Sequence, residues 1–285
     1  MSMLEILSTH RCFGGEQRFY QHQSEQTNCT MRLSVFLPHK ALNGGRCATV
    51  FYLAGLTCTE ETFITKGGAQ RLASELGLIL VCPDTSPRGV EIPGDRESWD
   101  FGVGAGFYVD ASESPWSNHY RMYSYIVDEL FDTVVAQLPI DVERIGIMGH
   151  SMGGHGALVI ALRNPEKFRS VSAFAPIANP TNCPWGIKAF GHYLGADQST
   201  WRSYDATELM ARSGGAVFQG GILVDQGLDD KFLEEQLLPL RFEEACAKAG
   251  QPLTVRRHEG YDHGYYFIST LVDDHLKHHA AQLSV

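Results

Sequence analysis

The sequence places one serine in a setting typical of a catalytic nucleophile. Residues 149–153 read Gly-His-Ser-Met-Gly, so Ser151 is the centre of a Gly-x-Ser-x-Gly motif. An apolar run (144–149) precedes the motif and a helix-like stretch (157–162) follows it. In this strand–turn–helix context a serine is held on a sharp turn with its hydroxyl exposed above the edge of a sheet. The alternative is a chance match among 29 glycines, and the two flanking elements favour a nucleophile.

A serine hydroxyl is a weak nucleophile unless a base takes its proton and a carboxylate orients that base. The α/β-hydrolases supply these groups in the chain order Ser, then Asp or Glu, then His. His263 follows the last expected strand and precedes the last expected helix, a position that no other of the twelve histidines shares. Asp225 ends an earlier strand and fits a role in fixing the loop through backbone hydrogen bonds. The residues alone leave Asp229 and Asp230 open as the acid.

An oxyanion hole needs two backbone N–H groups aimed at the developing negative charge. One belongs to the residue after the nucleophile, Met152, and we assign the other to Leu56, in the turn after the buried run 47–53. Gly55 would let the backbone approach a bound ester closely, although an ordinary tight turn is the alternative. Cys58 lies two residues beyond Leu56, so its modification would block the site and we mark it as a candidate regulatory thiol.

Other patterns carry weaker signals. His275 and His279 are four residues apart on the last expected helix, as in some metal pairs, but the Glu of a metalloprotease motif is missing, and we expect them on a solvated face. The glycines of residues 102–106 lack the strand and helix of a dinucleotide loop, so we expect a flexible pocket loop. His155 is expected to pack beneath the serine turn. No metal site and no organic cofactor are predicted.

Strands and helices must alternate along the chain to position these residues. An antiparallel N-terminal pair is expected across the turn at 21–28, with the second strand at 30–37. Further strands are expected at 47–53, 78–82, 144–149, 170–175, 221–225 and 253–258, and helices at 65–76, 119–138, 157–162, 232–249 and 265–280. This alternation predicts the α/β-hydrolase fold, with a mostly parallel central sheet and helices on both faces.

Two long segments stand between these elements. Residues 84–118 form a loop rich in Gly, Trp and Ser, and loops of that length in compact domains are usually functional. Residues 176–219 are aromatic and show no regular pattern, and we interpret them as a cap or pocket wall. With neither repeats nor a Pro/Ser-rich linker, the sequence predicts a single domain over residues 1–285, with a cap-like insertion around 176–219.

Composition excludes several classes of partner. The chain has 285 residues, a formal net charge of −10 and no cluster of Lys and Arg, which argues against nucleic acid and anionic membranes as partners. The N-terminal residues lack the features of a secretory signal, and no apolar run reaches membrane-spanning length. Seven cysteines without paired spacing fit reduced thiols. We therefore expect a cytoplasmic protein that acts on a small molecule.

The motifs taken together resemble one family closely, the S-formylglutathione hydrolases, also called esterase D. The resemblance runs essentially from end to end, and one departure is Gly264, where the family frequently has Ser. The matching stretches are 55–60, 107–111, 149–157, 172–176, 184–190, 225–230, 259–263 and 274–275. The serine motif alone would indicate only an α/β-hydrolase, whereas this set is specific to the family.

The resemblance implies a serine thioesterase. Its substrate would be S-formylglutathione, cleaved to glutathione and formate in the last step of glutathione-dependent formaldehyde detoxification, with side activity on short-chain esters. The resemblance maps the acid to Asp230, at the end of the Asp-Gln-Gly-x-x-Asp motif, and suggests a homodimer without cofactors. An esterase or acyltransferase with another substrate is one rival. A non-catalytic module is another, although Ser151, an acid and His263 are all present.

Formyl is the smallest acyl group, so a tight acyl pocket is expected. Trp99, Trp185 and the loop of Phe107 are candidates for its walls or for a glutathione groove, with core packing as the alternative for each aromatic. Glutathione carries two carboxylates, so we name Lys188 as a candidate cation in that groove.

Overall fold

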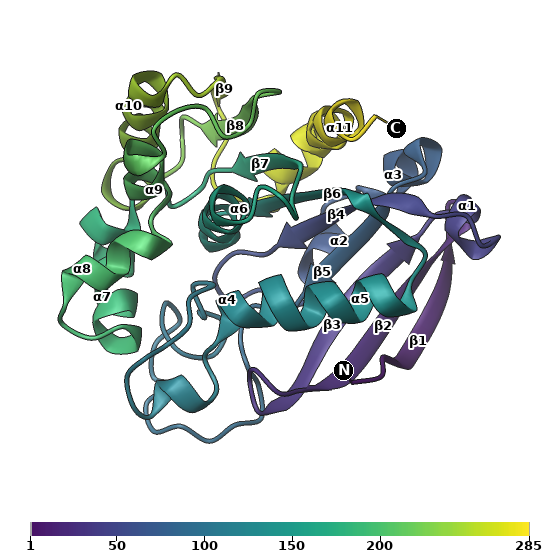
Figure 1. The fold of residues 1–285 in the computed structure, drawn as a ribbon, viewed down its shortest axis with the longest axis horizontal. Coiled ribbons are helices and arrows are strands. Elements are labelled where there is room, and N and C mark those ends of the chain that lie inside the picture. The colour runs from purple at the N-terminus through teal and green to yellow at the C-terminus, as the bar shows by residue number, and fades with distance from the viewer. Residues whose placement is uncertain (1, 285) are drawn as a thin grey trace.

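A nine-stranded sheet organises the computed structural model, which describes residues 2–284 (Figure 1). Its spatial order is β1-β2-β3-β5-β4-β6-β7-β8-β9. The pairs from β1 to β5 are antiparallel, and all pairs from β5 to β9 are parallel, which confirms the predicted mostly parallel sheet. The strands are β1 (Glu5–Cys12), β2 (Gly15–Ser24), β3 (Cys29–Leu37), β4 (Cys47–Leu53), β5 (Ile79–Pro83), β6 (Ile140–His150), β7 (Ser170–Phe174), β8 (Ile222–Gly227) and β9 (Leu253–His258).

The burial of each strand follows its composition. Every residue of β4, β5 and β7 is buried, because these central parallel strands are covered on both faces and consist mainly of apolar residues. At the edge of the sheet, β1 has mostly exposed residues and mixes apolar with charged side chains. The continuous apolar runs in the sequence therefore mark the centre of the sheet, next to the site.

Helices cover the sheet, and α5 lies in front of β2 and β3 (Figure 1). No helix within residues 2–284 is long and apolar enough to span a membrane. The helices are α1 (His39–Leu42), α2 (Thr62–Lys66), α3 (Gln70–Leu76), α4 (Met122–Ser124), α5 (Phe131–Gln137), α6 (Met152–Arg163), α7 (Pro184–Tyr193), α8 (Gln198–Trp201), α9 (Ala206–Arg212), α10 (Pro239–Ala249) and α11 (Tyr265–Gln282). Short 3-10 turns are η1 (Trp116–Asn118), η3 (Pro180–Asn182) and η4 (Arg202–Tyr204), and π turns are η2 (Tyr125–Leu130) and η5 (Leu233–Leu237).

The order of the strands reverses at β4. The chain passes from β4 to β5 on one side and returns to β6 on the other. Because crossovers between parallel strands are right-handed, α3, which leads into β5, and α6, which leads away from β6, cover opposite faces. Open α/β sheets bind ligands at such a reversal, outside the carboxyl ends of the strands. The segments that follow β4 and β6, with Leu56 and Ser151, meet at this point.

Three predicted helices differ from the structure. The helix expected at 65–76 is two helices, α2 and α3, because Gly67 and Gly68 interrupt it and Gly68 has φ +73°. The helix expected at 232–249 is divided into η5 and α10 at Leu238, which has φ +51° and precedes Pro239. The helix expected at 119–138 begins only at Met122 and contains the π turn η2.

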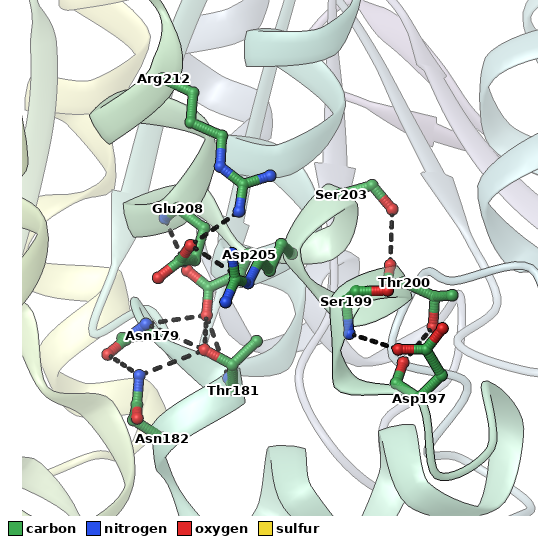
Figure 2. A network of polar contacts seen from close by, with 11 residues as sticks. Asn179, Thr181, Asn182, Asp197, Ser199, Thr200, Ser203, Asp205, Glu208 and Arg212 are labelled. Carbon is green, nitrogen blue, oxygen red and sulfur yellow. Dashed lines mark hydrogen bonds and ion pairs between the residues drawn. The ribbon is translucent and has the colours of Figure 1, made fainter.

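The segment 176–219 is not irregular, as the sequence suggested, but contains η3, α7, α8, η4 and α9. These helices gather on one side of the molecule, far from β1 (Figure 1). The buried carboxylate of Asp205 anchors them: it accepts hydrogen bonds from Asn179 Nδ2 (2.8 Å), from Thr181 N and Oγ1 (3.0 and 2.7 Å) and from the Glu208 amide (3.1 Å) (Figure 2). One side chain therefore joins the chain after β7 to the start of α9.

Candidate active site

Ser151 lies on a strained turn between β6 and α6. Its φ of 58° and ψ of −117° lie outside the regions that a non-glycine residue readily adopts. The turn requires two close backbone approaches: a Cβ on Gly153 would lie 1.9 Å from the carbonyl oxygen of Leu53, and one on Gly149 would lie 2.1 Å from that of Gly153. Only glycine fits at both positions, so the motif's glycines are there because strand and helix must touch.

The chain brings an acid and a base together on two neighbouring strand ends. Asp230 follows β8, and its Oδ2 accepts a hydrogen bond from Nδ1 of His263, which follows β9, at 2.5 Å. The other carboxylate oxygen, Oδ1, accepts from the amide of Phe232 at 2.9 Å. Gln226 donates to Oδ2 at 3.3 Å. The acid is therefore fixed on both oxygens, and the hydrogen bond to Nδ1 leaves Nε2 of His263 as the basic nitrogen.

The structure distinguishes Asp229 from Asp230, the two acids that the sequence left open, and places Asp225 in another cluster. Asp229 is exposed to solvent, whereas Asp230 is buried against His263. Asp225 is fully buried in another cluster and binds Arg256 Nε at 2.7 Å, His258 at 3.0 Å and His275 at 3.0 Å. The partners of its carboxylate are these side chains, and not the loop backbone expected from the sequence.

The negative charge of Asp225 is strongly stabilised in this second cluster. Burial alone would raise the pKa of Asp225, but hydrogen bonds from His275 and Arg256 outweigh burial and hold its pKa well below the ordinary value. Arg256 also bonds Asp274 on α11 at 2.7 Å. Asp225 is therefore a structural anion that ties β8, β9 and α11 together, away from the Asp230–His263 pair.

The proposed oxyanion amides lie on either side of the serine turn. A Cβ on Gly55 would lie 3.2 Å from the Cβ of Ser151, so the turn after β4 touches the nucleophile's residue. Within residues 2–284, neither the Leu56 amide nor the Met152 amide donates a backbone hydrogen bond. The next amide, that of Thr57, bonds the carbonyl of Gly104 at 2.9 Å and fixes the turn. Two free N–H groups therefore flank Ser151, as an oxyanion hole requires.

Two residues that the sequence analysis missed pack against His263. The His150 ring lies 4.5 Å from the His263 ring, centroid to centroid, and burial together with His263 lowers its pKa well below the ordinary value. The Phe232 ring meets His263 edge-on at 5.1 Å. In the sequence, only their positions could have indicated a contact with the base: His150 precedes the serine, and Phe232 comes two residues after the acid. His150 also connects the base to Ser151, the next residue.

The predicted substrate-binding residues fall into two groups. Trp99 is 56% exposed and meets Trp185 edge-on at 5.5 Å, and Trp185 packs against Phe232 at 4.7 Å. An aromatic wall thus runs from His263 to the surface. Phe107, by contrast, is fully buried against His155 and does not reach the surface. Nζ of Lys188 bonds Asp100 at 2.6 Å and Ser98 at 2.8 Å, so its charge is already paired within the chain.

The remaining candidate residues, Cys58, His155, His275 and His279, are packed within the fold. Burial raises the pKa of the Cys58 thiol, which reduces its reactive thiolate fraction. His155 is fully buried one turn after Ser151 on α6, and its Nε2 bonds the carbonyl of Phe107 at 2.9 Å. The expectation that His275 and His279 lie on a solvated face is wrong: both are fully buried, because Asp225 and serines of β7 bond them. Within residues 2–284 no cluster of His, Cys, Asp and Glu could hold a metal ion.

The fold and this constellation define a serine esterase of the α/β-hydrolase class. The family model described as "Putative esterase" matches residues 24–278. The chain is 54% identical over 282 residues to S-formylglutathione hydrolase of Mus musculus, covering 99% of both, and 49% identical over 285 residues to that of Arabidopsis thaliana, covering 100% of this chain and 99% of that one. The chain therefore belongs to the S-formylglutathione hydrolase family.

A solved structure agrees with this assignment. The S-formylglutathione hydrolase from Agrobacterium tumefaciens superposes with a TM-score of 0.94 at 50% identity, and the match covers 98% of this chain and 99% of that one. A serine hydrolase of Staphylococcus aureus, FphF, matches with a TM-score of 0.74 at 18% identity and shares the fold alone.

Proposed function

We propose that this protein hydrolyses S-formylglutathione to glutathione and formate through a formyl-enzyme intermediate. Ser151 is the nucleophile, His263 the base, and Asp230 the group that orients His263. One observation carries the proposal: the Asp230–His263 hydrogen bond lies against His150, the residue before the strained serine. The names of the relatives and the resemblance of the motifs support the choice of substrate.

In the acylation step the Ser151 Oγ attacks the formyl carbon, and Nε2 of His263 takes the serine proton. The oxygen of the tetrahedral intermediate becomes an anion, which the amides of Leu56 and Met152 stabilise. The C–S bond then breaks, the sulfur leaves with the electron pair, and the imidazolium gives its proton to the sulfur, which releases glutathione and leaves His263 neutral again. A thiolate is a good leaving group, so the imidazolium needs to supply less help than it does to an amine.

In the deacylation step a water molecule attacks the formyl ester while His263 again accepts a proton. The same two amides bind the second oxyanion. The Ser151 oxygen leaves and recovers its proton from His263, which releases formate and restores the enzyme. Asp230 stabilises the charged imidazole in both steps, and the chemistry uses no metal and no organic cofactor.

Substrate comparison tests both the chemistry and the preference. The ratio kcat/KM should be measured for S-formylglutathione and for a short aryl ester, on the wild type and on Ser151→Ala. Loss of the nucleophile should lower kcat on the order of 10⁵-fold or more for both substrates. Ser269→Ala, which removes an exposed hydroxyl of α11, is the matched control and should leave both values unchanged. Residual esterase activity in Ser151→Ala would refute the mechanism, and a clear preference for the aryl ester would refute the substrate.

We also propose that the chain acts as a cytoplasmic homodimer and as one domain over residues 1–285, with the helices of 176–219 as an insertion. The motif resemblance supports the dimer, and the single sheet, which takes strands from residue 5 to residue 258, supports the one domain. Sedimentation equilibrium measures the mass in solution, and a monomer at micromolar concentration would contradict the dimer.

A further inference from the structure

A polar cavity of about 580 Å³ lies beside the proposed oxyanion turn. It is bounded by residues that follow β4 and β5, among them Glu60 and Arg88, and by the first residues of β3, including Arg32. Because β3 runs antiparallel to β5, the start of β3 lies at the carboxyl end of β5. The cavity therefore opens at the same edge of the sheet as Ser151.

Two charged residues in this cavity, Glu60 and Arg32, form no ion pair within residues 2–284, although the charge of Arg32 acts on Glu60. Glu60 is only 5% exposed, and within that range no other residue donates a hydrogen bond to its carboxylate. Burial raises the pKa of Glu60 and nearby Asp84 raises it further, against smaller lowering effects of its own backbone N–H and of Arg32. The guanidinium of Arg32 is exposed and likewise forms no ion pair within that range. A buried carboxylate without a partner is costly, and a bound cation would offset the cost.

Glu61 also lines the cavity with an exposed side chain, whereas the two remaining charged residues pair with each other. Arg88 bonds Asp84 at 2.7 Å and also donates to the carbonyl oxygen of Cys58 at 3.0 Å. This pair forms a rigid floor and holds the turn that carries the Leu56 amide. Among the described residues, Glu60, Glu61 and Arg32 thus line the cavity without forming an ion pair, close to the oxyanion turn.

We propose that this cavity is the subsite for the zwitterionic end of the γ-glutamyl group, with Glu60 receiving the ammonium and Arg32 the carboxylate. The inference rests on the proposed function, in which the leaving group is glutathione. An α-amino acid end carries one charge of each sign, and the cavity offers carboxylates for its ammonium and Arg32 for its carboxylate. A simple anion or a simple cation would meet only one of these two kinds of side chain.

The distance also fits. Ser151 follows β6, which pairs with β4, and β4 pairs with β5. Two strand spacings amount to about 10 Å. An extended γ-glutamyl-cysteinyl unit covers a length on the order of 10 Å from sulfur to the amino acid end. Thr57 is exposed between the two places, so the peptide can cross the turn to reach the cavity.

Matched variants test the subsite. Arg32→Gln and Glu60→Gln should each raise KM for S-formylglutathione on the order of tenfold, with kcat nearly unchanged, because a charge-assisted hydrogen bond is lost in binding and not in the chemical step. Neither should change kcat/KM for a short aryl ester, which lacks the zwitterion. Arg71→Gln and Glu75→Gln, exposed on α3 outside the cavity, are the controls and should behave as the wild type.

The unmodified protein supplies the complementary test. N-acetylation of the substrate's γ-glutamyl amine removes the ammonium, so KM should rise for this analogue in the wild type and should not rise further in Glu60→Gln. Unchanged KM in both variants, or equal KM for the acetylated and free substrates, would overturn the subsite. Failure of the wild type to prefer the glutathione thioester over the aryl ester would instead overturn the proposed function.

Discussion

His263 is held on three sides by side chains from different parts of the chain. Asp230 bonds its Nδ1, Phe232 packs edge-on against its ring, and His150 covers another part of it. A base confined in this way loses little conformational freedom when it accepts a proton. The motif spacing predicts Ser151 as the nucleophile and His263 as the base. It was insufficient to choose between Asp229 and Asp230, because adjacent residues of a loop differ only in the direction of their side chains.

Replacement of Asp230 should mainly lower activity, whereas replacement of Asp225 should mainly lower stability. Asp230→Asn removes the anion that stabilises the charged base, so kcat should fall about 10⁴-fold while the thermal midpoint changes little. Asp225→Asn leaves Arg256 without its buried partner and should cost about 3–5 kcal/mol of unfolding free energy, with kcat largely kept in the protein that remains folded.

Steady-state kinetics and urea denaturation of both variants measure the two effects. Equal losses of kcat in the two variants would show that Asp225, and not Asp230 alone, serves the base. The two side chains are both buried aspartates that bond histidines, so each is the control for the other.

The elements that carry the site were predicted best where apolar runs are continuous. β4 is such a run and has the expected bounds; β9 has them too, although it is not a continuous apolar run. The helices were predicted less well for physical reasons. The break at Gly68 and the turn at Leu238 depend on positive φ values. The helices of 176–219 were missed because their aromatic residues pack against one another and obscure the helical period.

The contact between α6 and β4 should be intolerant of even one methyl group. Gly153→Ala would place a Cβ 1.9 Å from the Leu53 carbonyl, so α6 must move away from β4. We expect a loss of about 3 kcal/mol in stability and a large fall in kcat, since the Leu56 amide follows β4 directly. Gly191→Ala in α7 is the control: no atom lies within 4 Å of the place its methyl group would take, and a helical alanine should add about 0.5–1 kcal/mol. Thermal melting of both variants tests this account. A Gly153→Ala variant that melted like the wild type would contradict it.

At the scale of the whole molecule, a buried network joins α11 to the sheet. His275 bonds Asp225 and Ser172, and His279 bonds Ser170 at 2.6 Å and Ser172 at 3.0 Å. The sequence could not predict this network, because its partners come from β7, β8 and α11, which are far apart along the chain. A single sequence shows the spacing of two histidines on a helix but not the strand that faces them.

This network should make stability depend on pH. Burial lowers the pKa of His275 and of His279, so both stay neutral in the folded state, whereas unfolded histidines bind protons below about pH 6.5. The unfolded state therefore takes up more protons as the pH falls, and the folded state loses about 1.4 kcal/mol per histidine per pH unit below that value. Asp225, whose pKa is also lowered, adds a further loss only at the lower pH where unfolded aspartates protonate.

Calorimetry between pH 7.5 and 5 measures this dependence. The thermal midpoint should decrease with pH, and a His279→Gln variant should show a shallower decrease together with a lower midpoint at pH 7.5. Equal slopes for the two proteins would contradict the assignment to His279, and a midpoint independent of pH would contradict the role of both histidines.

The anchoring of α11 has a consequence for the newly made protein. The Leu56 turn and Ser151 lie within the first 151 of the 285 residues, but the base at residue 263 stands immediately before the helix that this network holds in place. The chain emerges from the ribosome N-terminus first, at about 5–20 residues per second. A nascent chain on the ribosome therefore has its nucleophile long before it has a fixed base. It gains hydrolytic activity only when α11 has emerged and docked.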